Sequence, residues 1–229
     1  ITTRLVGSEM CIRDRKHIIG ITPRFCNEPP KVQANYSYFV PFNKRDIIPI
    51  VLPVGSKHLK EVLDLCDGFL IIGGDDIDPK YYNQENKGFS RDVQPLIDEV
   101  DLEVIEYIKK NPKPTLGICR GIQSLAAFWG GSLYQDLDNE HVLHTSSNNE
   151  HDVVAVANTP LTKLLPSEFK VNTYHHQAVK RVPTDFIVSF MHDDAIEAIE
   201  HKNLPILGVQ WHPERYDTKE SEIIFDYFV

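Results

Sequence analysis

The sequence predicts an α/β fold, a three-layer sandwich in which a central, mostly parallel β-sheet lies between two layers of helices. In the first half of the chain, short apolar runs alternate with segments of helical periodicity, which is the pattern of a parallel sheet covered on both faces. The second half holds closely spaced strand-like runs, which are typical of added antiparallel hairpins. With 229 residues, 41% of them apolar, the chain can bury one large core.

The first half of the chain contains four runs that predict buried parallel strands, at residues 17–22, 47–53, 68–74 and 114–119. Apolar residues at helical spacing predict helices between these strands, at 58–66 and along Ile97, Val100, Val104 and Ile108, and a further helix after the last strand, at 121–131. Another helix is expected from Val32 through Tyr36 and Phe39. It should end near Pro41, because proline interrupts a helix.

The second half predicts hairpins from the runs at 151–157, 169–179, 186–194 and 195–200. The apolar run at 205–213 predicts a further buried strand. Asp217 and Glu220 resemble a capping box, which predicts a last helix at 218–228.

Residues 16–229 are expected to form a single domain, preceded by a non-native or disordered tail at residues 1–15. The segment VGSEMCIRDR at 6–15 resembles the translation of a sequencing-library adapter, so Cys11 is given no functional weight. A natural flexible tail is the alternative, and in neither case do these residues belong to the core.

Composition argues against several classes of partner. The net charge is −9, from 24 basic and 33 acidic residues without a basic cluster, which argues against nucleic acid. No apolar run is long enough to cross a membrane, and the first residues lack the apolar core of a signal peptide, so we expect a cytoplasmic protein. The four cysteines lack metal-site spacing, which favours free thiols.

The segment at 117–121 reads Gly-Ile-Cys-Arg-Gly, between a predicted strand and a predicted helix. This is the G-x-nucleophile-x-G pattern of a sharp strand–turn–helix corner, with cysteine in place of serine. The helix N-terminus favours a thiolate at Cys119, and the N–H groups of Arg120 and of Gly73 or Gly74 can bind a developing oxyanion. A buried cysteine in a tight turn is the structural alternative.

His212 is the candidate base for this thiol, because it follows a predicted buried strand and continues as Pro213-Glu214. Residues two apart in an extended segment point to the same side, and proline keeps its predecessor extended. Glu214 can therefore orient the imidazole of His212, as a third group does in cysteine catalysis. An exposed loop histidine is the alternative.

Together these motifs resemble the class I glutamine amidotransferase superfamily, and within it the gamma-glutamyl hydrolase group that includes gamma-glutamyl-gamma-aminobutyrate hydrolases. GGDDIDP at 73–79, GICRGIQ at 117–123, VNTYHHQAV at 171–179 and LGVQWHPE at 207–214 follow the group's order. Thr173 replaces the group's serine, and Asp193-Asp194 replaces its Asp-Gly turn. The resemblance implies a flavodoxin-like version of the predicted fold.

The resemblance also implies roles for individual residues. Cys119, His212 and Glu214 match the catalytic triad. Five further residues match positions that bind the oxyanion or border the substrate, namely Gly74, Arg120, Gln123, His175 and Gln177.

The implied activity is hydrolysis of a small γ-glutamyl amide through a γ-glutamyl thioester, without a cofactor. The alternatives are a glutaminase subunit that supplies ammonia to a separate synthetase, and a binding module that keeps the fold but not the activity. A homo-oligomer is compatible with either enzyme.

A metal site is not expected. His141, His144 and His151 have a spacing that suits zinc, but no cysteine or nearby carboxylate completes the site. The aspartates within residues 75–78 could bind a hard cation, yet a polar turn with one aspartate facing the substrate is the interpretation that we favour.

Overall fold

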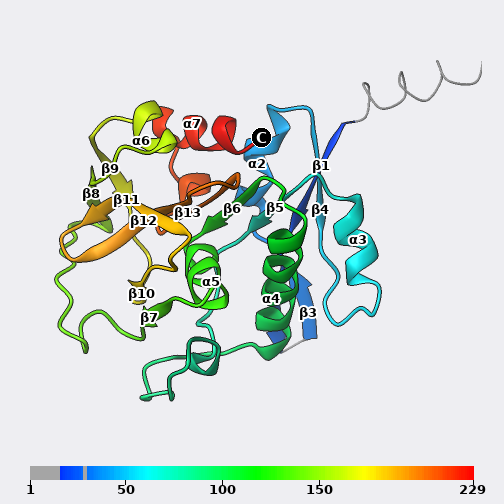
Figure 1. Cartoon of the computed structure of the whole chain (residues 1–229), viewed down its shortest axis with the longest axis horizontal. Helices are drawn as coiled ribbons and strands as arrows, with labels where there is room; N and C mark the ends of the chain where they lie inside the picture. The colour runs from blue at the N-terminus through cyan, green and yellow to red at the C-terminus, as the bar shows by residue number, and fades with distance from the viewer. Residues whose placement is uncertain (1–15, 28–29) are drawn as a thin grey trace, which may run out of the picture.

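The structure is a computed structural model that describes residues 16–27 and 30–229. The tail expected at 1–15, with Cys11, lies outside the described residues. One sheet of eleven strands runs through the described part of the chain (Figure 1). Its parallel half consists, in spatial order, of β4 (Ile47–Val51), β1 (His17–Ile21), β5 (Gly68–Ile71), β6 (Thr115–Ile118) and β13 (Ile206–Val209).

The antiparallel half continues from β13. In spatial order it consists of β12 (Ala195–His201), β11 (Phe186–His192), β8 (Glu150–Ala155) and β9 (Glu168–Asn172). β10 (Ala178–Arg181) pairs with β12 and with β7 (Ser132–Tyr134). The hairpins predicted for the second half of the chain therefore extend the parallel sheet, as expected.

Helices cover both faces of the sheet. The first face packs against α3 (Leu59–Leu65), α4 (Pro95–Lys110) and α5 (Arg120–Phe128), and Figure 1 shows α4 beside α5. The second packs against α2 (Val40–Asn43), α6 (Pro160–Leu164) and α7 (Lys219–Phe228).

Successive residues of β5 and its extension alternate between the two cores: Phe69 and Ile71 lie in the first, and Leu70 and Ile72 in the second. The three-layer sandwich is therefore confirmed. In residues 16–27 and 30–229, no helix is both long and apolar enough to span a membrane.

The helix predicted from Val32 to Pro41 is wrong. Val32 lies in β3 (Pro30–Gln33), which pairs with β2 (Arg24–Asn27) in a separate two-stranded hairpin. A short 3-10 helix, η1 (Tyr36–Tyr38), leads from the hairpin into α2. Pro41 lies in the first turn of α2 rather than at its end, because the first N–H groups of a helix have no intrahelical acceptor to lose.

The last helix is present, but its cap differs from the prediction. The N-cap of α7 is Thr218, whose hydroxyl accepts a hydrogen bond from the N–H of Ser221 at 3.2 Å. The capping box predicted at Asp217 and Glu220 is therefore one residue too early, because the hydroxyl at Thr218 satisfies the same donor position.

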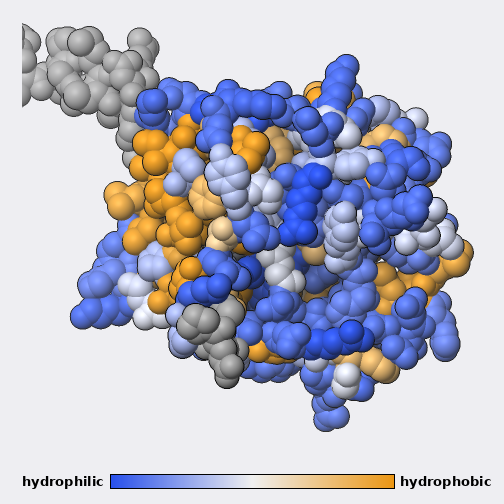
Figure 2. Space-filling view, turned by 180° about the vertical axis from the view of Figure 1, so that it is seen from behind, coloured by the Kyte–Doolittle hydropathy of each residue, from blue (hydrophilic) through white to orange (hydrophobic). Residues whose placement is uncertain are grey.

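The edge of the parallel half is formed by β4, where Ile48 and Val51 are 43% and 41% exposed, so the strand predicted at 47–53 is present but is not buried. Figure 2 shows apolar side chains gathered on the side of the molecule where β1 and β4 lie. Pro49 has no N–H to donate, which weakens this edge as a template for pairing with another chain. Homo-oligomer formation stays a prediction.

A tight corner joins β6 to α5. A Cβ atom on Gly117 would lie 2.6 Å from the backbone of Gly121, and a Cβ atom on Gly121 would overlap the carbonyl oxygen of Ile71. Because these obstacles are backbone atoms, no side-chain rotation relieves them. Both glycines therefore allow α5 to pack directly against the strands.

We expect Gly121→Ala to lower the free energy of unfolding by about 3 kcal/mol or more, since overpacking against a rigid neighbour is at the upper end of such effects. Gly88→Ala is the matched control: Gly88 has φ +87° but no atom within 4 Å of an added Cβ. It should lose only about 1–2 kcal/mol, from backbone strain. Urea denaturation measures both, and equal losses would contradict the packing argument.

Candidate active site

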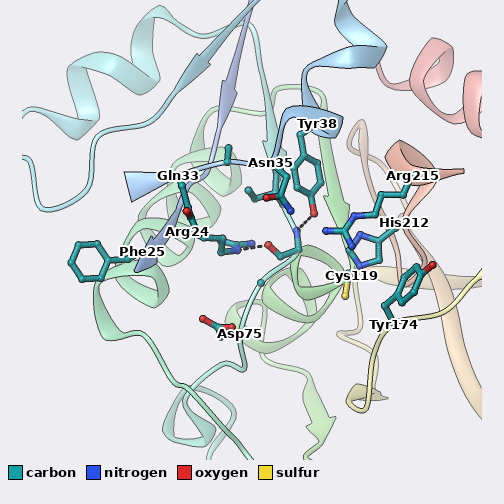
Figure 3. Close-up of a pocket in the computed structure, with 14 residues that line it drawn as sticks. Arg24, Phe25, Gln33, Asn35, Tyr38, Asp75, Cys119, Tyr174, His212 and Arg215 are labelled. Carbon is teal, nitrogen blue, oxygen red and sulfur yellow. Dashed lines mark hydrogen bonds between the residues drawn. The ribbon is translucent and has the colours of Figure 1, made fainter. Parts of the chain in front are cut away.

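Three neighbouring parallel strands end at one edge of the sheet and place their following residues together. Gly73 follows β5, Cys119 follows β6 and His212 follows β13. All three line one cleft of about 280 Å³ (Figure 3). Ligands of open α/β sheets bind outside the carboxyl ends of the strands, which is where this cleft lies.

Cys119 occupies a strained backbone conformation. Its φ is 54° and its ψ is −104°, in the region that residues with a Cβ rarely adopt. Strain of this kind is held by the surrounding structure and is found at functional sites. Here the N–H of Cys119 donates to the carbonyl oxygen of Val209 at 2.8 Å, and α5 begins directly after the cysteine. The partial positive charge at the start of α5 favours the thiolate.

His212 is held by two partners. Its Nδ1 lies 2.7 Å from Oε1 of Glu214, which leaves Nε2 for Cys119. Its backbone N–H donates to the Asn172 side chain at 2.8 Å, and the Asn172 amide donates back to the His212 carbonyl at 2.9 Å. The His–Glu pair matches the expectation, but the backbone does not. Residues Pro213–Arg215 form a 3-10 turn, η3, instead of continuing the strand.

The charges around His212 favour an ion pair with the thiol. Burial by itself lowers the pKa of His212, but the Cys119 thiolate and the Glu214 carboxylate outweigh burial and raise the pKa to about 10. The imidazolium form of His212 is therefore present below about pH 10, beside Cys119. Such a pair can attack a carbonyl carbon and then protonate a leaving group.

The glycine loop after β5 approaches the catalytic groups closely. A Cβ on Gly73 would lie 2.8 Å from Cε1 of His212, and the N–H of Gly73 donates to the hydroxyl of Tyr38 at 2.9 Å. Gly74 also lines the cleft, and its role as an oxyanion donor stays a prediction. The N–H of Arg120 lies in the first turn of α5, where helix N–H groups have no intrahelical acceptor.

The side chain of Arg120 points away from the cleft into the core. Its guanidinium pairs with Asp98 and Asp101 of α4, all of them buried. Asp101 also accepts a hydrogen bond from Ser124 at 2.8 Å and lies 3.8 Å from Arg24 of β2. This buried charge cluster joins α4, α5 and the β2–β3 hairpin.

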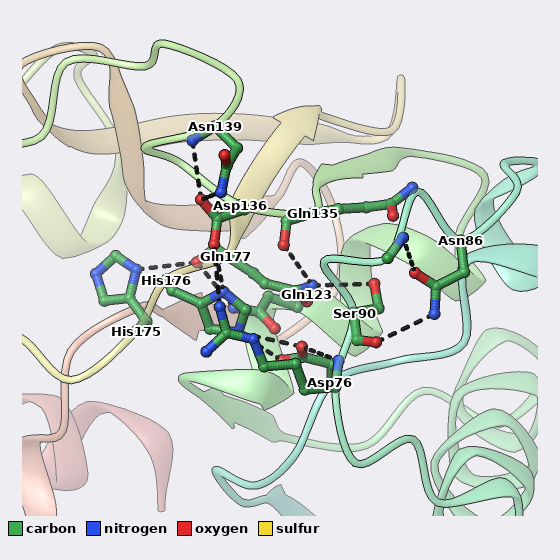
Figure 4. A network of polar contacts seen from close by, with 12 residues as sticks. Asp76, Asn86, Ser90, Gln123, Gln135, Asp136, Asn139, His175, His176 and Gln177 are labelled. Carbon is green, nitrogen blue, oxygen red and sulfur yellow. Dashed lines mark hydrogen bonds and ion pairs between the residues drawn. The ribbon is translucent and has the colours of Figure 1, made fainter.

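Three predicted substrate residues lie behind the cleft, and none of them is among the residues that line it. Gln123 donates to the Gln177 carbonyl oxygen at 3.1 Å, and His175 Nδ1 lies 2.9 Å from the same oxygen (Figure 4). The Gln177 amide donates to the carbonyl of Gln135 at 2.9 Å. Their substrate-binding roles stay predictions, since their polar atoms bind other parts of the protein.

Sequence reasoning missed most of the cleft wall. The lining residues without a predicted role include Arg24, Asn35, Tyr38, Tyr174 and Arg215. Tyr174 lies within the motif at 171–179 and Arg215 directly follows the motif at 207–214, so these motifs were a usable signal. Asn35 and Tyr38 come from the segment wrongly predicted as a helix, Arg24 comes from the unassigned residues before it, and nothing local marks any of the three.

The aspartate turn after the glycine loop is divided between the cleft and the fold. Asp75 lines the cleft, and burial together with nearby Asp92 raises its pKa. Asp76 pairs instead with His176 at 3.1 Å, and Asp78 caps the following 3-10 helix, η2 (Pro79–Tyr82). The polar-turn interpretation agrees with these contacts.

Fold and cleft together define the class: a mixed α/β sheet with a cysteine elbow beside a strand-end His–Glu pair is a class I glutamine amidotransferase-like protein, of the gamma-glutamyl hydrolase group. A glutamine amidotransferase from Thermotoga maritima has the same fold, with a TM-score of 0.60 at 17% identity, over 87% of this chain and 77% of that one. More narrowly, residues 17–214 match the peptidase C26 family, to which the chain belongs.

Two relatives illustrate the similarity. Protein NtpR of Enterococcus hirae is 37% identical over 200 residues, which is 80% of this chain and 83% of the relative. The gamma-glutamyl-gamma-aminobutyrate hydrolase PuuD of Escherichia coli is 31% identical over 204 residues, which is 80% of this chain and 79% of the relative.

The raised pKa of His212 is directly testable. In an NMR titration of labelled histidine, the ring signal that His212→Gln removes should titrate near pH 10. Glu214→Gln and Cys119→Ala should each move this titration to lower pH, because each removes a negative charge that holds the proton. An unchanged midpoint in both variants would show that neither neighbour stabilises the imidazolium.

Proposed function

We propose that the protein is a cysteine-dependent hydrolase that cleaves the γ-glutamyl amide bond of a small compound such as γ-glutamyl-γ-aminobutyrate. The proposal rests on one observation above others: the cleft brings a strained Cys119 at a helix N-terminus together with the buried His212–Glu214 pair. The peptidase C26 membership and the similarity to the hydrolase PuuD support this chemistry.

In the proposed reaction, the Cys119 thiolate attacks the γ-carbonyl carbon of the substrate. The N–H groups of Gly74 and Arg120 bind the oxyanion, where one donor is worth about 3 kcal/mol in comparable enzymes. His212 then gives its proton to the departing amine, and a γ-glutamyl thioester forms on Cys119. Water, deprotonated by His212, cleaves the thioester and restores the thiol.

The cleft also offers groups for the two charges on the α-carbon of a γ-glutamyl substrate. Arg24 Nη2 is buried without a hydrogen-bond partner, while Nε and Nη1 donate to the carbonyl oxygens of Gly73 and Pro23. In Figure 3, Asp75 lies across the glycine loop from Tyr38, on the Arg24 side. We assign Arg24 to the substrate α-carboxylate and Asp75 to the α-ammonium group.

A second candidate function is a glutaminase that supplies ammonia to a separate synthetase, favoured by the fold shared with a glutamine amidotransferase. The discriminating measurement is amine release by the purified chain alone from glutamine, γ-glutamyl-γ-aminobutyrate, a γ-glutamyl dipeptide and a polyglutamate. Turnover of a γ-glutamyl amide other than glutamine supports the hydrolase. Glutamine hydrolysis that rises only with an added synthetase supports the glutaminase.

Cys119→Ser should reduce hydrolysis at least about 1,000-fold, because the hydroxyl is not deprotonated by His212 as the thiol is. Cys66→Ser is the matched control, since Cys66 is the other free buried cysteine among the described residues and lies outside the cleft. It should keep its activity. Hydrolysis that survives Cys119→Ser would exclude both enzyme proposals and favour a different nucleophile.

Arg24→Gln should raise KM about 10–100-fold with a smaller change in kcat, because a charge-assisted contact to the α-carboxylate is lost. The specific readout is a substrate analogue whose α-carboxylate is replaced by a carboxamide. The wild type and Arg24→Gln should handle this analogue equally. Arg181→Gln, an exposed arginine outside the cleft, is the control and should leave KM unchanged. A KM defect that persists with the analogue would contradict the assignment.

A further inference from the structure

A cluster of histidines surrounds one buried carboxylate outside the catalytic cleft. The Glu197 side chain of β12 is completely buried, and three histidine Nε2 atoms approach its oxygens. His144 lies 3.4 Å and His175 lies 3.6 Å from Oε1, while His151 lies 3.5 Å from Oε2. His144 and His151 are close in the sequence, but His175 and Glu197 come from other parts of the chain, so the fold assembles the cluster.

These polar atoms lack hydrogen-bond partners. Both oxygens of Glu197 and the Nε2 atoms of all three histidines are buried without one, since the gaps are longer than a normal hydrogen bond. Buried polar atoms are nearly always satisfied, so a group of five unsatisfied atoms facing one another needs an explanation. An ion between them would provide it.

The tautomer of His175 explains why its Nε2 atom does not hydrogen-bond to Glu197. Its Nδ1 lies 2.9 Å from the carbonyl oxygen of Gln177, which can only accept, so the ring proton is on Nδ1. Nε2 then presents a lone pair to the carboxylate of Glu197. Metal-binding histidines show this arrangement, in which the second ring nitrogen donates to a carbonyl or carboxylate and aims the other at the metal. A neutral imidazole and an ionised carboxylate are the forms of these side chains that bind a metal.

Two of the separations between the proposed ligand atoms also fit a known coordination geometry. With zinc bonds of about 2.0–2.1 Å, two ligand atoms of a tetrahedral site lie about 3.3 Å apart. The observed N···O separations of 3.4 and 3.6 Å to Oε1 are close to this value. His144, His175 and Glu197 each offer one ligand atom, all within 4.8 Å of one another.

We propose that His144 Nε2, His175 Nε2 and Glu197 Oε1 bind a zinc ion, with His151 donating to the second carboxylate oxygen. Two nitrogen ligands and one carboxylate oxygen suit zinc and leave a fourth position open. His144 and His175 line a separate cavity of about 280 Å³, which provides an entry path. Nearby His192 is excluded as a ligand, since both its ring nitrogens contact carbonyl oxygens at 2.6–2.7 Å.

The site is independent of the proposed hydrolase chemistry, but it adjoins the segment that holds the base. His175 lies shortly after Asn172, whose side chain hydrogen-bonds to the backbone of His212. It directly follows Tyr174, which lines both the catalytic cleft and the second cavity. A metal bound at His175 therefore ties this segment to β12. The bound ion is expected to stabilise the fold.

The test uses full-length protein without a histidine tag, stripped with a chelator and titrated with zinc against a chromophoric competitor. We expect one tight equivalent per chain. Glu197→Gln and His175→Asn should each lower the zinc affinity at least about 100-fold, because each removes a ligand. Cys119→Ala should keep the site, because the catalytic thiol is not a ligand. His58→Gln, an exposed histidine, controls for surface binding.

Two further measurements hold even if the ligand variants fold poorly. Zinc should raise the melting temperature of the wild type by about 5 °C or more at saturation. X-ray absorption at the zinc edge should show nitrogen and oxygen ligands with imidazole scattering and no sulfur. A sulfur ligand, binding lost in Cys119→Ala, or the absence of a tight equivalent in the wild type would each overturn the proposal.

Discussion

The close approach of α5 to β5 and β6 is the constraint on which the candidate active site depends. Gly117 and Gly121 leave no room for a Cβ atom between helix and sheet. The chain therefore turns within one residue, and Cys119 takes a positive φ as the link between β6 and α5. The same turn aims the helix N-terminus at the thiol. Packing, backbone strain and electrostatics are thus consequences of one corner.

Buried charges connect this corner to the cleft wall. Arg120 follows the cysteine and pairs with Asp98 and Asp101, and Asp101 lies beside Arg24. Burying a charge is unfavourable unless it is paired, so each member holds the others in position. The cluster thereby anchors the β2–β3 hairpin, which brings Arg24 to the mouth of the cleft. Asn172 holds the backbone of His212 through two hydrogen bonds, and His175, which belongs to the cluster around Glu197, follows Asn172 closely in the sequence.

Sequence patterns predicted most of the fold because they are local. Buried parallel strands are nearly all apolar, and the runs at β1, β5, β6 and β13 show it, whereas the equally apolar β4 forms the partly exposed edge. The helix predicted from Val32 to Pro41 is wrong because the pattern that predicted it is also local. Its apolar residues are spaced like a helix face, but Val32 pairs in a hairpin, and pairing depends on the partner strand rather than on spacing.

The sequence by itself determined the elbow at Cys119 and the His212–Glu214 pair, since each is a motif of a few neighbouring residues. Only the tertiary structure decided what surrounds them. Arg24 and Tyr38 reach the cleft across the sheet, while Gln123 and Gln177 turn into the core. Glu197 joins His144 and His175 although no local spacing relates them. Such contacts arise from strand order and helix packing, which short motifs do not encode.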